Sequence, residues 1–186
     1  MISRKYLAGL ILFSFLSGCA TLVPWTPMRA KEYAERSQGF KAVMPPDWMR
    51  ANFVPYFIIT KDGTALDAIM VERYKFKKKL EYTKKMFLPD MTSQELADVE
   101  IDNFKSNLKV GRFEVSSNRP ITVSGQQGFV FEYSFVTTDG LKINGIHYGF
   151  IYKEWVYRIR FEAAAQHYFN KYLTDFNRFR ESFILL

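Results

Sequence analysis

Large apolar residues alternate with smaller or polar ones through much of the second half of the chain. Between residues 129 and 136 every second residue is aromatic, and residues 155–161 show the same period of two. This period is typical of half-buried antiparallel strands. A third run covers residues 141–152, and short turns at Thr138-Asp139-Gly140 and Lys153-Glu154 join the three runs. The pattern therefore predicts a meander of three strands.

The preceding part of the chain has three further strand patterns. Residues 40–44 are stopped by Pro45 and Pro46, which cannot continue the hydrogen-bonded ladder of a sheet. Residues 56–60 and 65–74 flank Lys61-Asp62-Gly63, a sequence that favours a hairpin.

Two helices are predicted to pack on this sheet. Thr92 and Glu95 have the spacing of a capping box, and the helix that they begin ends by Gly111. Its apolar stripe consists of Ala97, Ile101, Phe104 and Leu108. Its charged residues fit a solvated face: Asp98, Glu100, Asp102 and Lys105. The chain closes on a helix with the stripe Ala165, Tyr168, Phe169, Tyr172, Phe176, Phe179 and Phe183.

The N-terminus has the pattern of an export signal. Two cations, Arg4 and Lys5, precede ten almost wholly apolar residues, 7–16. As a helix such a run spans about 15 Å, too short for a bilayer core of roughly 30 Å. It ends in Leu16-Ser17-Gly18-Cys19, which resembles the lipobox of bacterial lipoproteins. The alternative is a common secretory signal that ends near a cysteine by coincidence.

The lipobox resemblance implies a signal peptide over residues 1–18, in which Leu16, Ser17 and Gly18 are recognised by the signal peptidase. It also implies diacylglycerol on the sulfur of Cys19 and acylation of the new N-terminus, and two signals of this kind give lasting membrane attachment. Ala20 after the cysteine favours sorting to the outer membrane if the host has two membranes. The expected location is the bacterial cell envelope.

Residues 19–38 are expected to be a lipidated tether with a short ordered piece. Thr26 and Pro27 have the cap and first-turn preferences of a helix that would end before Gly39. Residues 39–186 are expected to form a single α+β domain.

Composition limits the classes of partner. Hydrophobic residues make up 48% of the chain and aromatic residues 17%, enough for a packed core. The net charge of +7 becomes +5 when the signal peptide leaves with two cations. In the envelope a basic domain meets anionic lipids and acidic polymers, so nucleic acid is not an expected partner. One cysteine and two histidines exclude a disulfide framework and a structural zinc site of Cys or His, and no cofactor is predicted.

The order of these elements resembles that of the PsbP, Mog and DcrB superfamily. The resemblance covers residues 39–183 and includes the strand that ends in Met44-Pro45-Pro46-Asp47-Trp48, the hairpin, the middle helix, the meander that rises from Val123-Ser124-Gly125, and Tyr157-Arg158-Ile159-Arg160-Phe161 before the last helix. It implies an antiparallel β-sheet flanked by helices, an αβα sandwich. It also implies service as a binding or accessory module.

Catalytic residues are not indicated. The only candidate histidine bases are His147, in a strand, and His167, at the start of the last helix. Glu132 lies in the same meander and is a conceivable partner of His147, but no nucleophile is marked by a nearby glycine-rich elbow. Both histidines are interpreted as structural or surface residues, and the chain is not expected to be an enzyme.

The segment from Arg73 to Lys85 has seven cations and one acidic residue, with aromatic residues between them. Such a mixture suits an anionic membrane surface or an acidic partner. Its alternative interpretation is a solvated strand end and loop. The candidate contacts are Lys75, Lys77, Lys78, Lys79, Lys84 and Lys85.

Two functions stay open at this point. The first is a non-catalytic binding or accessory module that is held at the membrane by its N-terminal lipid and serves an envelope protein. The alternative is a carrier of a small apolar or lipid ligand, in which the surplus of Phe and Tyr lines a cavity rather than fills a core.

Overall fold

The computed structural model describes residues 24–29, 31–107 and 109–186. Leu108 lies outside these residues, as do the predicted signal peptide and lipobox with Cys19. Within the described part of the chain, neither helix is long and apolar enough to cross a bilayer.

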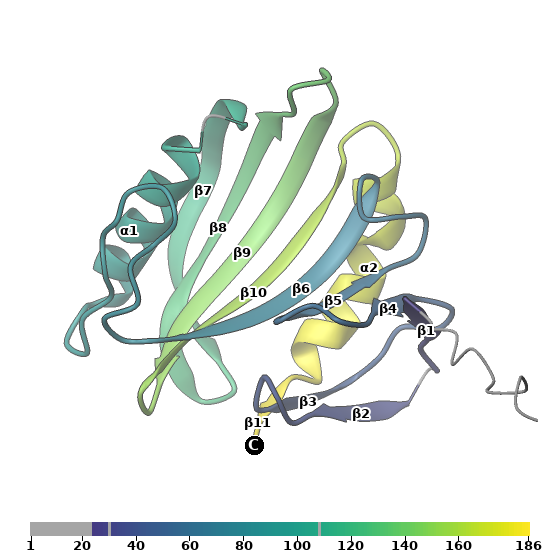
Figure 1. Ribbon diagram of the computed structural model, residues 1–186, viewed down its shortest axis with the longest axis horizontal. Coiled ribbons are helices and arrows are strands. Elements are labelled where there is room, and N and C mark those ends of the chain that lie inside the picture. Colours follow the sequence, from purple (N-terminus) through teal and green to yellow (C-terminus); the bar gives the residue numbers. More distant parts are fainter. Residues whose placement is uncertain (1–23, 30, 108) are drawn as a thin grey trace, which may run out of the picture.

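The core of the fold is an antiparallel sheet of eight strands, which curves across the molecule in Figure 1. In spatial order the strands are β1 (Trp25–Pro27), β4 (Met49–Ala51), β5 (Phe57–Thr60), β6 (Asp67–Lys75), β10 (Trp155–Ala164), β9 (Lys142–Tyr152), β8 (Gln126–Val136) and β7 (Gly111–Val123). The predicted meander is confirmed as β8, β9 and β10, and the predicted hairpin as β5 and β6.

A smaller sheet of three strands consists of β11 (Ile184–Leu185), β3 (Phe40–Val43) and β2 (Glu32–Glu35). The prediction of a helix that begins at Thr26 is wrong, because this part of the chain forms β1 and β2 instead. Backbone pairing of Trp25 with Ala51, and of Tyr33 with Ala42, outweighs the weak helix signal. The described part of the segment 19–38 is thus paired into both sheets.

Strand β7 was not among the predicted strands. It pairs with β8 along the outer edge of the large sheet, with two irregularities in register. Its residues are mostly exposed or half-buried, so they lack the strong alternation that marks the meander.

Helix α1 (Ser93–Lys105) begins with the predicted capping box. The side chain of Thr92 accepts a hydrogen bond from the backbone N–H of Glu95, and the side chain of Glu95 accepts one from the backbone N–H of Thr92. Its buried residues are Leu96, Ala97, Val99 and Glu100, and the predicted stripe residues Ile101 and Phe104 are partly buried against the same core. Glu100 is therefore a correction: it is 1% exposed and does not belong to the solvated face. The cause is an arginine on the sheet, described below.

The two helices cover opposite faces of the large sheet, which confirms the predicted sandwich (Figure 1). Helix α1 packs on β7, β8 and β9, whereas α2 (Tyr168–Glu181) packs on β10, β6 and β3. The α2 side holds the main aromatic core with Phe161, Phe176 and Phe179, all fully buried. Trp48 is also buried there and donates to Asp175 of α2 at 3.2 Å.

Candidate functional site

A polar cleft of about 280 Å³ lies on the α1 face of the sheet. Its walls are α1, the stretch from residue 78 to residue 82, and the β6, β9 and β10 strands. The charged and titratable residues that line it include Glu72, Lys78, Lys79, Glu100, His147, Arg158 and Arg160.

Arg158 is the centre of the cleft's ion pairs. It alternates along β10 with Tyr157 and Ile159, whose side chains enter the α2 core, and so it faces α1. Its Nε donates to Oε1 of Glu100 at 2.5 Å, and its Nη1 lies 3.7 Å from Oε2 of Glu72. Its guanidinium also stacks on the ring of Tyr74, 4.2 Å from the centroid. One arginine thus joins the helix, β6 and β10.

Arg160 extends this network two residues further along β10. Its Nη2 lies 3.5 Å from Glu72, its Nη1 lies 3.5 Å from Glu162, and Glu162 in turn accepts a hydrogen bond from the hydroxyl of Tyr133. The guanidinium carbon of Arg160 is 5.7 Å from the ring centroid of Phe104 on α1. The arginines therefore lie side by side between the helix and the sheet, with a shared partner in Glu72.

Burial changes the acid–base behaviour of the groups in this cleft. It raises the pKa of the Glu100 carboxyl, although the Arg158 guanidinium opposes this shift. Burial likewise raises the pKa of the Tyr74 hydroxyl to about 12. The largest cause in both cases is the loss of water around the charged form.

His147 lies at the inner wall of the cleft and is fully buried. Its ring stacks on Phe131 at 4.8 Å and meets Phe104 edge to face at 5.7 Å. Burial, together with the charges of Arg160 and Arg158, holds the pKa of His147 well below its usual value. Within the described structure neither ring nitrogen has a hydrogen-bond partner.

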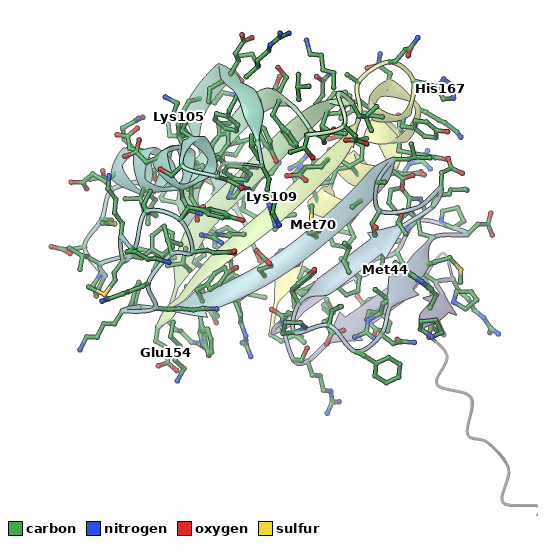
Figure 2. All side chains as sticks on the ribbon, turned by 45° about the horizontal axis from the view of Figure 1, so that its top comes forward. Met44, Met70, Lys105, Lys109, Glu154 and His167 are labelled. Atoms are coloured by element: carbon green, nitrogen blue, oxygen red, sulfur yellow. The ribbon has the colours of Figure 1, made fainter. Side chains whose placement is uncertain are left out.

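The pairing of Glu132 with His147 does not occur. His147 lies opposite Phe131 in the sheet, whereas Glu132 lies opposite Ile146 and is exposed. His167 is exposed at the start of α2 and makes no capping bond through its side chain. Figure 2 places His167 at the far end of the molecule from Glu154, which marks the β9–β10 turn.

Two guanidinium donors of the cleft's arginines have no acceptor within the described residues. They are Nη2 of Arg158 and Nε of Arg160, both buried. A guanidinium N–H group is a strong donor to carboxylate or phosphate oxygens. These two atoms have almost no exposed surface, so the arginines act on the described cleft through their positive charge.

The six predicted contact lysines differ in their contacts. Lys78 and Lys79 are exposed and line the cleft. Lys75 pairs with Glu154 at 3.4 Å, Lys85 pairs with Asp102 of α1 at 2.6 Å, and Lys84 donates to the backbone oxygen of Glu81. Lys77 is exposed and has a positive φ of 68°.

The sequence interpretation missed the network of Glu72, Glu100, Arg158 and Arg160. The available signal was the position of Arg158 and Arg160 in a strand whose flanking residues are large and apolar. Two arginines on one face of a strand in the middle of a sheet require acidic partners when a helix covers that face. Because those partners lie in β6 and α1, local spacing did not reveal them.

Searches against protein-family models and against curated protein sequences found no match. Solved structures with a similar fold include the PsbP protein CyanoP of Synechocystis sp. PCC 6803, at a TM-score of 0.59 and 12% identity. That match covers 92% of this chain and 99% of CyanoP.

Two further structures have the same architecture. The Ran-binding protein Mog1p of Saccharomyces cerevisiae matches at a TM-score of 0.57 and 11% identity, over 85% of this chain and 96% of Mog1p. LpqN of Mycobacterium tuberculosis, described as involved in cell envelope biogenesis, matches at 0.52 and 15% identity, over 87% of this chain and 90% of LpqN. At these identities the similarity concerns the fold alone. The chain therefore has a PsbP/Mog1-like fold.

Proposed function

We propose that this protein is a lipid-anchored envelope protein that binds an acidic group of a partner protein in the cleft beneath Lys78 and Lys79. The observation that carries the proposal is the pair of buried arginines with unused donor atoms on the cleft wall. In this proposal the protein acts as a binding or accessory module and catalyses no reaction.

The charges around the cleft support an acidic partner. Its lining includes four cations, Lys78, Lys79, Arg158 and Arg160, against the three carboxyl groups of Glu72, Glu81 and Glu100. Burial raises the pKa of Glu100, which disfavours its negatively charged form and so reduces the negative charge in the cleft. A carboxylate or phosphate that enters the cleft would pair with the exposed lysines at the mouth and be attracted by the charges of the two arginines inside.

The proposal that the protein catalyses no reaction is based on the pKa and the surroundings of His147, the histidine of the cleft. A general base needs a pKa near the working pH and access to the proton that it abstracts. His147 has a strongly lowered pKa and lies in a stack of phenylalanine rings. Its neighbours offer a planar apolar packing surface rather than a carboxylate that would orient it as a base.

The envelope location is proposed on the lipobox and on the fold shared with LpqN. The sequence leaves four residues between Cys19 and Pro24, where the described structure begins, and Trp25 already belongs to the large sheet. When extended, the five residue steps from Cys19 to Pro24 reach about 17 Å. Lipidation of Cys19 would therefore hold the domain directly against its membrane, which is the outer membrane in a host with two membranes.

The carrier of a small apolar ligand stays a prediction without a specific observation in its favour. The aromatic side chains that motivated it pack ring on ring, for example Phe161 on Phe176 at 5.1 Å and Phe150 on Tyr157 at 5.3 Å. The described cleft on the α1 face is lined by charged groups, which suit a polar ligand better than an apolar one.

The test is crosslinking in cells at the native expression level, followed by mass spectrometry of the captured proteins and lipids. We expect one protein partner in stoichiometric amount with the wild type. The double variant Lys78→Glu/Lys79→Glu should lose it, because both substitutions reverse the charge at the cleft mouth.

The matched control is Lys109→Glu/Lys142→Glu, which makes the same change in charge at two exposed sites outside the cleft. A Cys19→Ala variant separates anchoring from binding. If the cleft variant captures the partner as well as the control does, the cleft is not the binding site. If only a small apolar molecule is captured, the carrier function is favoured instead.

A further inference from the structure

The loop between β4 and β5, residues 52–56, presents an apolar tip to solvent. Phe53 is 74% exposed and is the most exposed large hydrophobic residue of the described chain, and its neighbour Val54 is 37% exposed. Phe53 also has a positive φ of 62°, a backbone conformation that is costly for an aromatic residue. Strain and exposure at the same apolar residue indicate a role outside the core.

The strained tip is held in place from both sides. The backbone N–H of Asn52 donates to the oxygen of Pro24 at 2.8 Å, and its side-chain amide donates to Thr26 at 2.8 Å. On the other side, the amide of Gln38 donates to the oxygen of Pro55 at 2.9 Å. The loop therefore does not need to rearrange in order to present Phe53.

These bonds place the tip beside the first residues of the described fold. Pro24 is separated from Cys19 by only a few residues, with a reach of about 17 Å along the chain. The inference rests on the proposed lipidation of Cys19, which would put the membrane surface within that distance of the tip.

Cations gather at the same end of the sheet. Phe57, which follows the loop, pairs with Val71, so the loop lies alongside the last residues of β6. That strand ends at Lys75, which lies opposite Trp155 in the sheet and forms an ion pair with Glu154, next to Lys153 in the β9–β10 turn. An exposed aromatic residue near lysine side chains is the combination found where proteins touch anionic lipid.

We infer that Phe53 and Val54 insert into the headgroup region of the membrane that carries the lipid anchor, with Lys153 turned toward its anionic lipids. The anchor fixes the distance of the domain from the membrane, and the tip fixes its orientation. The upper end of the sheet, with the β8–β9 turn at Thr138, then points away from the membrane (Figure 1).

The experiment uses the full lipidated protein in vesicles of phosphatidylethanolamine and phosphatidylglycerol with brominated acyl chains. Because Cys19 is the only native cysteine and its sulfur would carry lipid, a Phe53→Cys variant accepts a polarity-sensitive fluorophore at one site. The matched control is Thr138→Cys, an exposed position at the opposite end of the sheet.

We expect the probe at position 53 to shift its emission to the blue and to be quenched by the brominated lipid, and the probe at position 138 to show neither effect. If the protein floats with the vesicles but both probes respond equally, the inference is wrong while lipidation stands. If the protein does not float with vesicles at all, lipidation fails and the inference fails with it.

Discussion

Arg158 of β10 donates from Nε to the carboxylate of Glu100 on α1, and both side chains are almost completely buried. This ion pair connects two residues that are 58 positions apart in sequence. It is the reason that α1 turns an acidic residue toward the sheet. Since each charge has given up water, the position of the helix and the charge state of the cleft depend on the same contact.

Removing one partner of this ion pair should destabilise the protein more than removing both partners. We expect Arg158→Met to lower the free energy of unfolding by about 3–5 kcal/mol, because it leaves Glu100 buried without its partner. The double variant Arg158→Met/Glu100→Leu should recover part of this loss. Urea unfolding of the wild type, both single variants and the double variant gives the coupling energy.

The exposed pair of Lys85 and Asp102 is the control for that cycle, since it joins the same helix at a distance of 2.6 Å. Both side chains are about half exposed, so their coupling should be below about 1 kcal/mol. Purely additive effects in the Arg158 and Glu100 cycle would show that the buried contact does not carry the stability assigned to it.

His147 should make the protein sensitive to mild acid. Its pKa is well below 6.5 in the folded protein, mainly through burial, whereas in the unfolded chain it returns to the ordinary value. As the pH falls below 6.5 the unfolded state binds a proton that the folded state does not bind. Stability is then lost by up to about 1.4 kcal/mol per pH unit, until the lowered pKa is reached.

The variant His147→Leu removes this titration while it keeps an apolar side chain between Phe131 and Phe104. Its unfolding free energy relative to the wild type should therefore rise between pH 7 and pH 5. Glu100 has a raised pKa and contributes a change of opposite sign, but it is present in both proteins. Parallel pH profiles would contradict the assignment to His147.

Gly149 of β9 should not tolerate a side chain. A Cβ atom at this position would lie 2.3 Å from the Phe129 ring, which itself stacks on His147. We expect Gly149→Ala to lower the free energy of unfolding by about 1–3 kcal/mol, as for other overpacked cores. At Gly111 the nearest atom to an added Cβ is 3.3 Å away, so Gly111→Ala is the control. Equal loss in the two variants would mean that the ring moves aside freely.

The sequence predicted the elements whose signals are local. The alternation in residues 129–161 gave the meander, and Thr92 with Glu95 gave the start of α1. The prediction for residues 25–35 was wrong, because their conformation depends on strand pairing with Ala51 and Ala42 rather than on their own helix preference.

The candidate site was predictable only at its mouth. Lys78 and Lys79 belong to a cation-rich segment that is visible in the sequence, and the structure places them on the cleft. The interior was not predictable, because Glu100 is a charged residue in a helix with other acidic residues and has the local pattern of a solvated one. The fold brings Arg158 next to Glu100, and this contact allows Glu100 to be buried.

A small dianion should stabilise the protein through the cleft. The lysines at its mouth can pair with carboxylates, and the positive charges of Arg158 and Arg160 attract them, in a volume of about 280 Å³. Glutarate that binds only the folded state would raise the melting temperature with its concentration. We expect this rise in the wild type at constant ionic strength, and its loss in Lys78→Glu/Lys79→Glu.

The comparison with Lys109→Glu/Lys142→Glu separates binding from a general effect of salt, since that variant has the same net charge and an unchanged cleft. It should respond to glutarate as the wild type does. Chloride at the same ionic strength should produce no such difference between the two double variants, because screening of surface charges does not depend on the cleft. An equal response of both double variants to glutarate would show that the anion acts elsewhere, and it would remove the acidic group from the proposed function.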